Sequence, residues 1–400
     1  MLVERYRIRQ QKLRSKLAEL GWDGFWVTQN VDMYYLNGSM QTGYLFIPAR
    51  GEPIFYVRRS VLRAEEESSC SVEELGSLRT LEERLIARYP ELYANGRRPV
   101  IATEFDVLPV QWFRRLEAAL SRFVWEDGSK LIREVRMIKD ADELDSIRKA
   151  AQVTDAALEH ALAQLKLGMT DLELVRLVEM ESRRQGHSGQ MRMRGYNQEI
   201  ITGMVGSGSA AAIPTYFDGP AGGQGLGAAT PQGAGQKRIQ PNEPILVDIG
   251  CCIEGYLIDQ TRTVVIGELA PHLEQAYRVA EEILRETEAR LKPGTICEDL
   301  YLLALEMAER AGLRQHFMGF DRDQVSFLGH GVGLEIDELP ILARGFRYPL
   351  EEGMVIAIEP KFTFPGQGVV GIENTYAITS DGFEKLTRSR EGVIRLPCLH

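Results

Sequence analysis

Two aspartates in the second half of the chain stand in apolar runs where unpaired charge is costly. Asp248 and Asp259 flank the turn of "ILVDIGCCIEGYLIDQTRT", which we predict to be a β-hairpin. A turn at 253–254 places the two directly opposite, about 5 Å apart, whereas a turn at 254–255 makes them diagonal neighbours. In both registers the carboxylates share one face. Like charges so placed predict a divalent cation between them; the alternative is an edge hairpin whose acids face water.

Two further acids and one histidine occur in comparable settings. Glu359 ends "GMVIAIEP" and Glu373 stands within "GVVGIENTYAIT", and we predict a strand for each run. Acids in such runs are local conflicts, and these gather at functional sites. His330 lies in "GHGVGLEIDELP", where glycines let the backbone approach a ligand. A histidine alone is more often structural, but four strand-borne acids beside it predict a metal centre.

Composition narrows the class of protein. The 400 residues are 44% hydrophobic and 26% charged, as in a soluble protein of about two domains. The formal charge of -10 offers no basic surplus for nucleic acid. No apolar run of about 18 residues is present, so no membrane span is expected, and the first residues predict an amphipathic helix, not a signal peptide. Five scattered cysteines without a C-x-x-C pair fit a reducing compartment, and we expect a cytoplasmic protein.

The chain divides near residue 132. Residues 1–132 alternate predicted helices and strands, from a helix over 7–21 to one over 108–120, and indicate an α/β domain. Residues 133–400 contain two similar stretches, "KLGMTDLELVRLVEMESRRQG" (166–186) and "KPGTICEDLYLLALEMAERAG" (292–312). Each has Lys-x-Gly, a threonine predicted to cap a helix, a glutamate three residues on and a closing glycine, and each follows a long helix. We predict an internal duplication within 140–390, although any two capped amphipathic helices share some of these features.

Four motifs now point to a known family. The stretches "VDIGCCIEGYLIDQTRT", "GHGVGLEIDELP", "LEEGMVIAIEP" and "GIENTYAIT" resemble, in order and spacing, those of the pita-bread metallopeptidases, such as aminopeptidase P, prolidase and the related creatinase. The region around "GWDGFWVTQNVDMYYLNG" resembles the smaller N-terminal domain of prolidase-like members. The resemblance implies an α/β N-terminal domain, an α+β pita-bread domain with a pseudo-twofold duplication, and a homodimer. The family's metal ligands fall on Asp248, Asp259, His330, Glu359 and Glu373.

The resemblance also implies a reaction. Two divalent ions (manganese, cobalt, iron or zinc) would share the carboxylates and activate a water for attack on an amide bond. Glu359 would be both a metal ligand and the proton carrier. The implied activity is that of an Xaa-Pro dipeptidase or aminopeptidase acting on a small peptide.

Three positions depart from the family pattern. Asp337 replaces a histidine that follows the metal histidine, Thr215 replaces the histidine of an "LPH" motif, and Gly371 stands where aminopeptidase P-like members carry arginine. An ionised aspartate only accepts hydrogen bonds, so Asp337 would be protonated, act as a base, pair with a cation, or have no role in a solvated loop. These departures leave two other functions open. One is altered chemistry with Asp337 as base, on a small amide or as a sulfonium C–S lyase; the other is a non-catalytic binding protein.

Four residues are candidates for binding the substrate. Arg192 and Arg194 in "MRMRGYNQE" could bind a carboxylate bidentately, although an ordinary surface pair is the alternative. Thr215 and Tyr216 would line the pocket.

Overall fold

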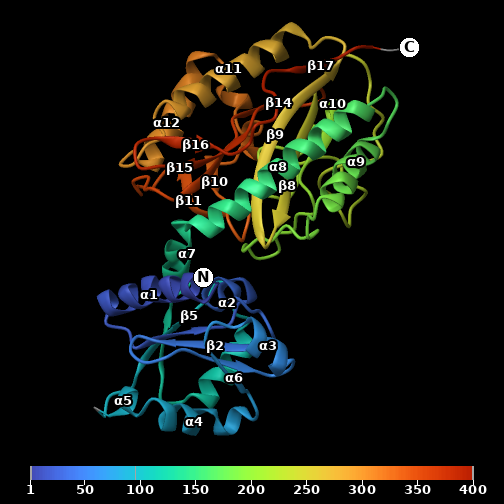
Figure 1. The fold of residues 1–400 in the computed structure, drawn as a ribbon. Coiled ribbons are helices and arrows are strands. Elements are labelled where there is room, and N and C mark those ends of the chain that lie inside the picture. Colours follow the sequence, from blue (N-terminus) through green and yellow to red (C-terminus); the bar gives the residue numbers. More distant parts are fainter. Residues whose placement is uncertain (1, 95, 399–400) are drawn as a thin grey trace. The chain divides into compact units, whose positions relative to one another are not determined.

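A computed structural model describes residues 2–94 and 96–398. The chain forms two compact units, Met1–Arg136 and Met137–His400, and each is described by itself (Figure 1). The boundary predicted at residue 132 falls within helix α7 (Ser129–Met137). Among the helices of the described residues, none has both the length and the apolar character needed to cross a membrane.

The first unit is a six-stranded mixed sheet with helices around it. The strand order is β4-β3-β2-β1-β5-β6. Its strands are β1 (Gly24–Val27), β2 (Gly43–Pro48), β3 (Ile54–Val57), β4 (Ser71–Glu74), β5 (Val100–Thr103) and β6 (Val124–Asp127). Its helices are α1 (Leu2–Leu20), α2 (Asn30–Asn37), α3 (Val61–Glu67), α4 (Leu81–Arg88), α5 (Pro90–Tyr93) and α6 (Val110–Ala119). The predicted helices over 7–21 and 108–120 correspond to α1 and α6.

The described part of the second unit contains two larger sheets, each with its own pair of helices, and one two-stranded sheet. One sheet has the order β17-β9-β8-β7, the other β11-β10-β12-β15-β16, and β13 pairs with β14. The strands are β7 (Val205–Ser207), β8 (Ile245–Ile253), β9 (Tyr256–Ile266), β10 (Phe327–Gly331), β11 (Glu338–Ala343), β12 (Val355–Ile358), β13 (Lys361–Phe364), β14 (Gly368–Gly371), β15 (Asn374–Ile378), β16 (Phe383–Lys385) and β17 (Ile394–Leu396). The helices are α8 (Ala141–Gln164), α9 (Asp171–Arg184), α10 (Gly208–Ala211), α11 (Pro271–Glu288) and α12 (Cys297–Arg310).

These helices build two hydrophobic cores. Apolar residues of α8 and α9 pack with those of β8 and β9 in one cluster, and α8 lies across these two strands in Figure 1. Apolar residues of α11 and α12 pack with those of β10, β12 and β15 in the other. Burial of one face of each sheet by a helix pair fixes where the opposite, polar face of the hairpins lies.

The two halves repeat the same backbone contacts. The Gly168 N–H donates to the Ile239 carbonyl at 3.0 Å, and the Gly294 N–H donates to the Leu350 carbonyl at 2.8 Å. Each bond ties the turn before the second helix of a half to the segment leading into its central hairpin. The predicted duplication is therefore present in the fold.

The duplication also determines which side chains correspond. Asp248 follows Ile239 at the same interval in the chain as Glu359 follows Leu350. One acid from each half thus enters the region between the two hairpins from an equivalent position.

The helix caps of the two halves differ. Thr170 and Glu173 form the predicted capping box of α9, with the Glu173 N–H donating to Thr170 Oγ1 at 3.1 Å. The matching prediction for Thr295 is wrong: Ile296 is the N-cap of α12, and Thr295 Oγ1 donates to the Arg290 carbonyl at 2.7 Å. Thr295 lies one residue before the cap, because the aligned glycines of the two repeats place Ile296 opposite Thr170.

Candidate metal centre

The β8–β9 hairpin sets the positions of two predicted ligands. It turns at Glu254 and Gly255, whose φ angles of 52° and 89° are those that a two-residue type I′ turn requires. This is the second of the two predicted registers. Asp248 lies opposite Thr261, so Asp248 and Asp259 are diagonal neighbours on one face.

Glu359 and Glu373 lie where two paired strands bend. The predicted single strand over 368–379 is wrong, because it divides into β14 and β15, which belong to different pairings. The register of β12 with β15 continues unchanged into β13 with β14, so Glu359 and Glu373 are opposite each other at the bend. Pro360 has no N–H to continue the ladder, and the Glu373 N–H donates to Thr261 of β9 at 3.1 Å. The bend thereby joins the two sheets at the acids.

All five predicted ligands converge in the structure. Asp259, His330 and Glu373 form one group whose ligand atoms lie within 4.8 Å of one another, and Asp248, Glu359 and Glu373 form a second. Glu373 belongs to both groups and is 1% exposed. These are the residues that could hold a divalent metal.

The first group fits a metal ion by its donor chemistry. His330 Nδ1 donates to the Gly331 carbonyl at 3.2 Å, which leaves Nε2 as the nitrogen with a free lone pair. Glu373 Oε1 is buried and has no hydrogen-bond partner among the described residues. Such an oxygen is costly unless a ligand satisfies it. One imidazole and two carboxylates suit manganese, iron, cobalt or zinc.

The second group already surrounds a cation. Lys361 is fully buried, and its Nζ donates to Glu359 Oε2 at 2.5 Å, Asp248 Oδ2 at 2.9 Å and Glu373 Oε2 at 3.2 Å. The sequence analysis missed this residue. The sequence did contain a signal, because the lysine in "EPKFTF" is a charged residue inside an apolar run. The same criterion identified Glu359.

The pKa shifts show how strongly the acids require positive charge. Burial raises the pKa of Asp248; the ammonium of Lys361 lowers it part of the way, and Glu373 raises it again. Burial, Glu373 and Asp248 together raise the pKa of Asp259 well above its ordinary value. Burial alone would lower the pKa of Lys361, but the three carboxylates hold it well above its usual value, so Lys361 is an ammonium. The centre is therefore built around cations.

Neighbouring groups hold Glu373 in place. Thr261 Oγ1 donates to Glu373 Oε2 at 2.6 Å. The buried guanidinium of Arg262 donates to the Glu373 carbonyl at 2.7 Å and to Asn374 Oδ1 at 2.9 Å. These bonds fix both the backbone and one carboxylate oxygen of Glu373, and Thr261 is a second contributor that the sequence analysis did not identify.

The predicted arginines meet the loop that follows β10. The Arg194 N–H donates to Asp337 Oδ1 at 3.2 Å, and the Arg194 guanidinium pairs with the buried Glu335 at 3.6 Å. The half-buried Arg192 donates to Gln190 at 2.7 Å. Asp337 belongs to neither group of ligand atoms. The structure thus joins Asp337 and Arg194 to each other through a hydrogen bond from the Arg194 backbone.

A cavity of about 770 Å³ contains the other substrate candidates. Thr215, Tyr216 and Phe217 line it, together with Arg322 and Thr363. Thr363 follows Lys361 by two residues in β13, so the cavity reaches the strand that carries the lysine.

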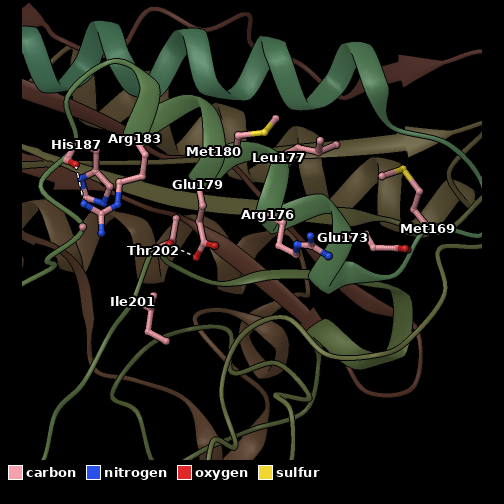
Figure 2. Close-up of a pocket in the computed structure, with 11 residues that line it drawn as sticks. Met169, Glu173, Arg176, Leu177, Glu179, Met180, Arg183, His187, Ile201 and Thr202 are labelled. Atoms are coloured by element: carbon pink, nitrogen blue, oxygen red, sulfur yellow. Dashed lines mark hydrogen bonds between the residues drawn. The ribbon is translucent and has the colours of Figure 1, made fainter.

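Another cavity of about 770 Å³ runs along α9 (Figure 2). Figure 2 shows a hydrogen bond between Thr202 and Glu179, in which Thr202 Oγ1 donates to Glu179 Oε1 at 2.7 Å, and Met180 and Ile201 also line the cavity. None of the predicted site residues lines this cavity. The candidate metal ligands therefore lie at the hairpins and not along this cavity.

Comparisons with known proteins agree with this fold. Residues 145–380 match the model of metallopeptidase family M24, and residues 9–138 match that of the creatinase/prolidase N-terminal domain. The chain belongs to metallopeptidase family M24 and is a peptidase-type enzyme, which confirms the predicted family and fold class.

Individual relatives cover nearly the whole chain. Among solved structures, a prolidase from Pyrococcus horikoshii has a TM-score of 0.78 at 25% identity over 96% of this chain and 99% of its own. An Xaa-Pro dipeptidase from Bacillus anthracis has a TM-score of 0.80 at 25% identity over 98% and 100%. An uncharacterized peptidase of Staphylococcus aureus is 28% identical over 381 residues, 94% of this chain and 97% of the relative.

Proposed function

We propose that this chain is a divalent-metal-dependent peptidase that cleaves small peptides of Xaa-Pro type, as a dipeptidase or an aminopeptidase. The observation that carries the proposal is the convergence of Asp248, Asp259, His330, Glu359 and Glu373 between the two hairpins. The similarity to a prolidase and an Xaa-Pro dipeptidase supports the substrate class. The further predictions of a cytoplasmic homodimer, and of manganese, cobalt, iron or zinc as the metal, belong to the same proposal.

The site residues have distinct roles in this proposal. A bound divalent ion supplies Lewis acidity toward the scissile carbonyl and an activated water. Glu359, whose Oε1 lies 3.6 Å from His330 Nε2, carries the proton from the water to the leaving amine. Tyr216 and Phe217 offer apolar surface for the peptide side chains, and Thr363 offers a hydroxyl at the edge of the same cavity.

The test is product release from a panel of Xaa-Pro dipeptides and tripeptides. The purified chain is treated with a chelator and reloaded with manganese, cobalt, iron or zinc in turn. We expect release of proline or of the N-terminal residue, and its loss in His330→Ala. His272→Ala is the matched control, because His272 is exposed and bonds only Gln367 among the described residues, and it should keep the activity. A folded, metal-loaded protein that cleaves no member of the panel would overturn the Xaa-Pro assignment.

The aspartate at position 337 supports a second candidate function. An acid in place of the family's histidine suits a small cationic substrate, such as an amide or a sulfonium compound, with Asp337 as base. A parallel panel of such compounds distinguishes this chemistry from peptidase activity. The retention of all five ligands argues against a non-catalytic binding protein.

A further inference from the structure

We propose that Lys361 takes the place of one of the two metal ions that the family implies, so that the centre binds a single divalent ion at Asp259, His330 and Glu373. The inference rests on the proposed metal-dependent function and deepens it. It differs from the two-ion expectation in the number of ions, and it makes Asp248 and Glu359 partners of the lysine where the family pattern makes them metal ligands.

The lysine and a second ion compete for the same oxygens. Lys361 Nζ lies 2.5 Å from Glu359 Oε2 and 2.9 Å from Asp248 Oδ2. A transition-metal ion binds carboxylate oxygens at about 2.0–2.2 Å. An ion that used these oxygens would therefore occupy the space that the ammonium fills, and the two positive charges would repel at contact distance.

Glu373 has one oxygen with partners and one without. Its Oε2 accepts from Lys361 at 3.2 Å and from Thr261 at 2.6 Å. Its Oε1 is buried without any hydrogen-bond partner among the described residues. Because the group with Asp248 and Glu359 already surrounds an ammonium, the unsatisfied oxygen is available to an ion held with Asp259 and His330.

The charge of the centre agrees with one ion and one ammonium. Asp248, Asp259, Glu359 and Glu373 carry four formal negative charges. Lys361 and one divalent ion supply three positive charges and leave the centre slightly negative. A second divalent ion, with the lysine still inside, would make the centre positive before any water ionised.

The opposing strand is shaped for the lysine. Lys361 pairs with Gly371 in the β13–β14 register. A Cβ atom at position 371 would lie 2.7 Å from Lys361 Cγ and 2.6 Å from the Pro360 carbonyl oxygen. The arginine that aminopeptidase P-like members carry at this position is therefore incompatible with Lys361 as placed. In this chain the cation is carried by β13, opposite Gly371 of β14, and its ammonium lies within the ligand cluster.

The experiment counts metal ions in the full-length chain. The protein is stripped with a chelator, reloaded with excess Mn²⁺ and freed of unbound metal, and manganese per chain is measured by mass spectrometry. Electron paramagnetic resonance on the same samples distinguishes an isolated Mn²⁺ from an exchange-coupled pair. The variants are Lys361→Met, which keeps the length and removes the charge, and Lys139→Met, a control at another buried lysine, whose Nζ bonds Glu338 at 2.9 Å outside the cluster.

We expect one isolated Mn²⁺ ion per chain in the wild type and in Lys139→Met. In Lys361→Met we expect the manganese content per chain to rise twofold and the spectrum to be that of an exchange-coupled pair. Two coupled ions in the wild type would overturn the inference while leaving the proposed function intact. A folded Lys361→Met that still binds one ion would also overturn it. If Lys361→Met does not fold, Lys361→Gln replaces it, and the wild-type count and spectrum alone still decide. A wild type that binds no ion would refute the proposed function itself.

Discussion

Lys361 and Gly371 lie directly opposite each other in the β13–β14 pair, and the absence of a side chain at 371 leaves the space through which the lysine reaches the acids. This relationship connects two features that look independent in the sequence. One is the missing arginine at position 371, and the other is a lysine two residues after the ligand Glu359. Together they replace one arrangement of positive charge at the metal centre by another.

Gly371→Ala should destabilise the protein. Its new Cβ meets the Pro360 carbonyl oxygen at 2.6 Å and Lys361 Cγ at 2.7 Å, so the strand pair must shift. Overpacking of this kind costs about 1–3 kcal/mol in the free energy of unfolding, which urea titration measures. Gly382→Ala is the control, because the nearest atom to its Cβ is Thr379 Oγ1 at 4.0 Å. Equal stability of the two variants would contradict the steric argument.

Thr261→Val should weaken metal binding without loss of fold. The substitution keeps the shape of the side chain but removes the hydroxyl that donates to Glu373 Oε2 at 2.6 Å. Loss of a partner that orients a ligand typically costs about 10–100-fold in metal affinity, which calorimetric titration with Mn²⁺ measures. Thr287→Val removes an equally buried hydroxyl that bonds only within α11, and its affinity should match the wild type. Similar affinities for both variants would show that Thr261 does not orient Glu373.

The sequence predicted the site well where the residue types and the two-residue period of a β-strand indicated the same positions. A period of two placed Asp248 and Asp259 on one face in either register, and residue type selected His330, Glu359 and Glu373. The turn could not be settled from sequence, because 253–254 and 254–255 both fit; two residues with positive φ favour the second. The bend at Glu373 was missed because an apolar run does not reveal that a strand changes partners.

Lys361 was missed for a different reason. A lone lysine in a strand is ordinarily assigned to a solvated edge, and only the position of three acids around it shows otherwise. The role of Arg194 was also not predictable, because the sequence alone suggests that it binds a substrate. Its pairing with Glu335 depends on a loop more than a hundred residues away in the chain.

Glu391 should make stability depend on acid pH. Burial alone would raise its pKa, but hydrogen bonds from Lys385, Asn374 and Arg285 lower it to about 2, from 4.5 in an unconstrained chain. A depressed folded-state pKa adds stability above about 4.5 that is lost as the pH falls toward 2. Since the carboxylate is partly exposed, we expect a contribution of about 1–2 kcal/mol.

Urea titrations from pH 7 to pH 3 measure this contribution. The wild type should lose much of its advantage over Glu391→Gln between pH 4.5 and pH 3, and should keep it unchanged above that range. The exposed Glu286, which pairs with Arg290 four residues further along the chain, provides the control Glu286→Gln, and its difference from the wild type should stay small. A constant difference between wild type and Glu391→Gln at all pH values would refute the assignment.

Metal removal should lower the melting temperature reversibly. Glu373 Oε1 is buried without a hydrogen-bond partner among the described residues, and a bound ion would supply one, so we expect the ion to stabilise the folded chain. A ligand present at a hundred times its dissociation constant adds about 2.7 kcal/mol. Calorimetry with chelator and then with restored Mn²⁺ measures the shift. His330→Ala should show little response to either addition, and a full response there would place the ion elsewhere.

The Asp337→Asn variant tests whether the charge of this side chain matters, because it removes the charge and keeps the shape of the side chain in the loop after β10. The amide oxygen can still accept the Arg194 N–H, as Asp337 Oδ1 does at 3.2 Å, so the free energy of unfolding should change by less than about 0.5 kcal/mol. Only the negative charge and the ability to take up a proton are lost. If Asp337 acts as a base, as we propose for the second candidate function, the turnover number should fall by about 10²-fold or more.

A drop in turnover with an unchanged fold would make Asp337 part of the reaction. Unchanged turnover on every substrate that the wild type cleaves would limit Asp337 to tethering the Arg194 segment, and the histidine-to-aspartate replacement would then be explained by loop structure and not by chemistry.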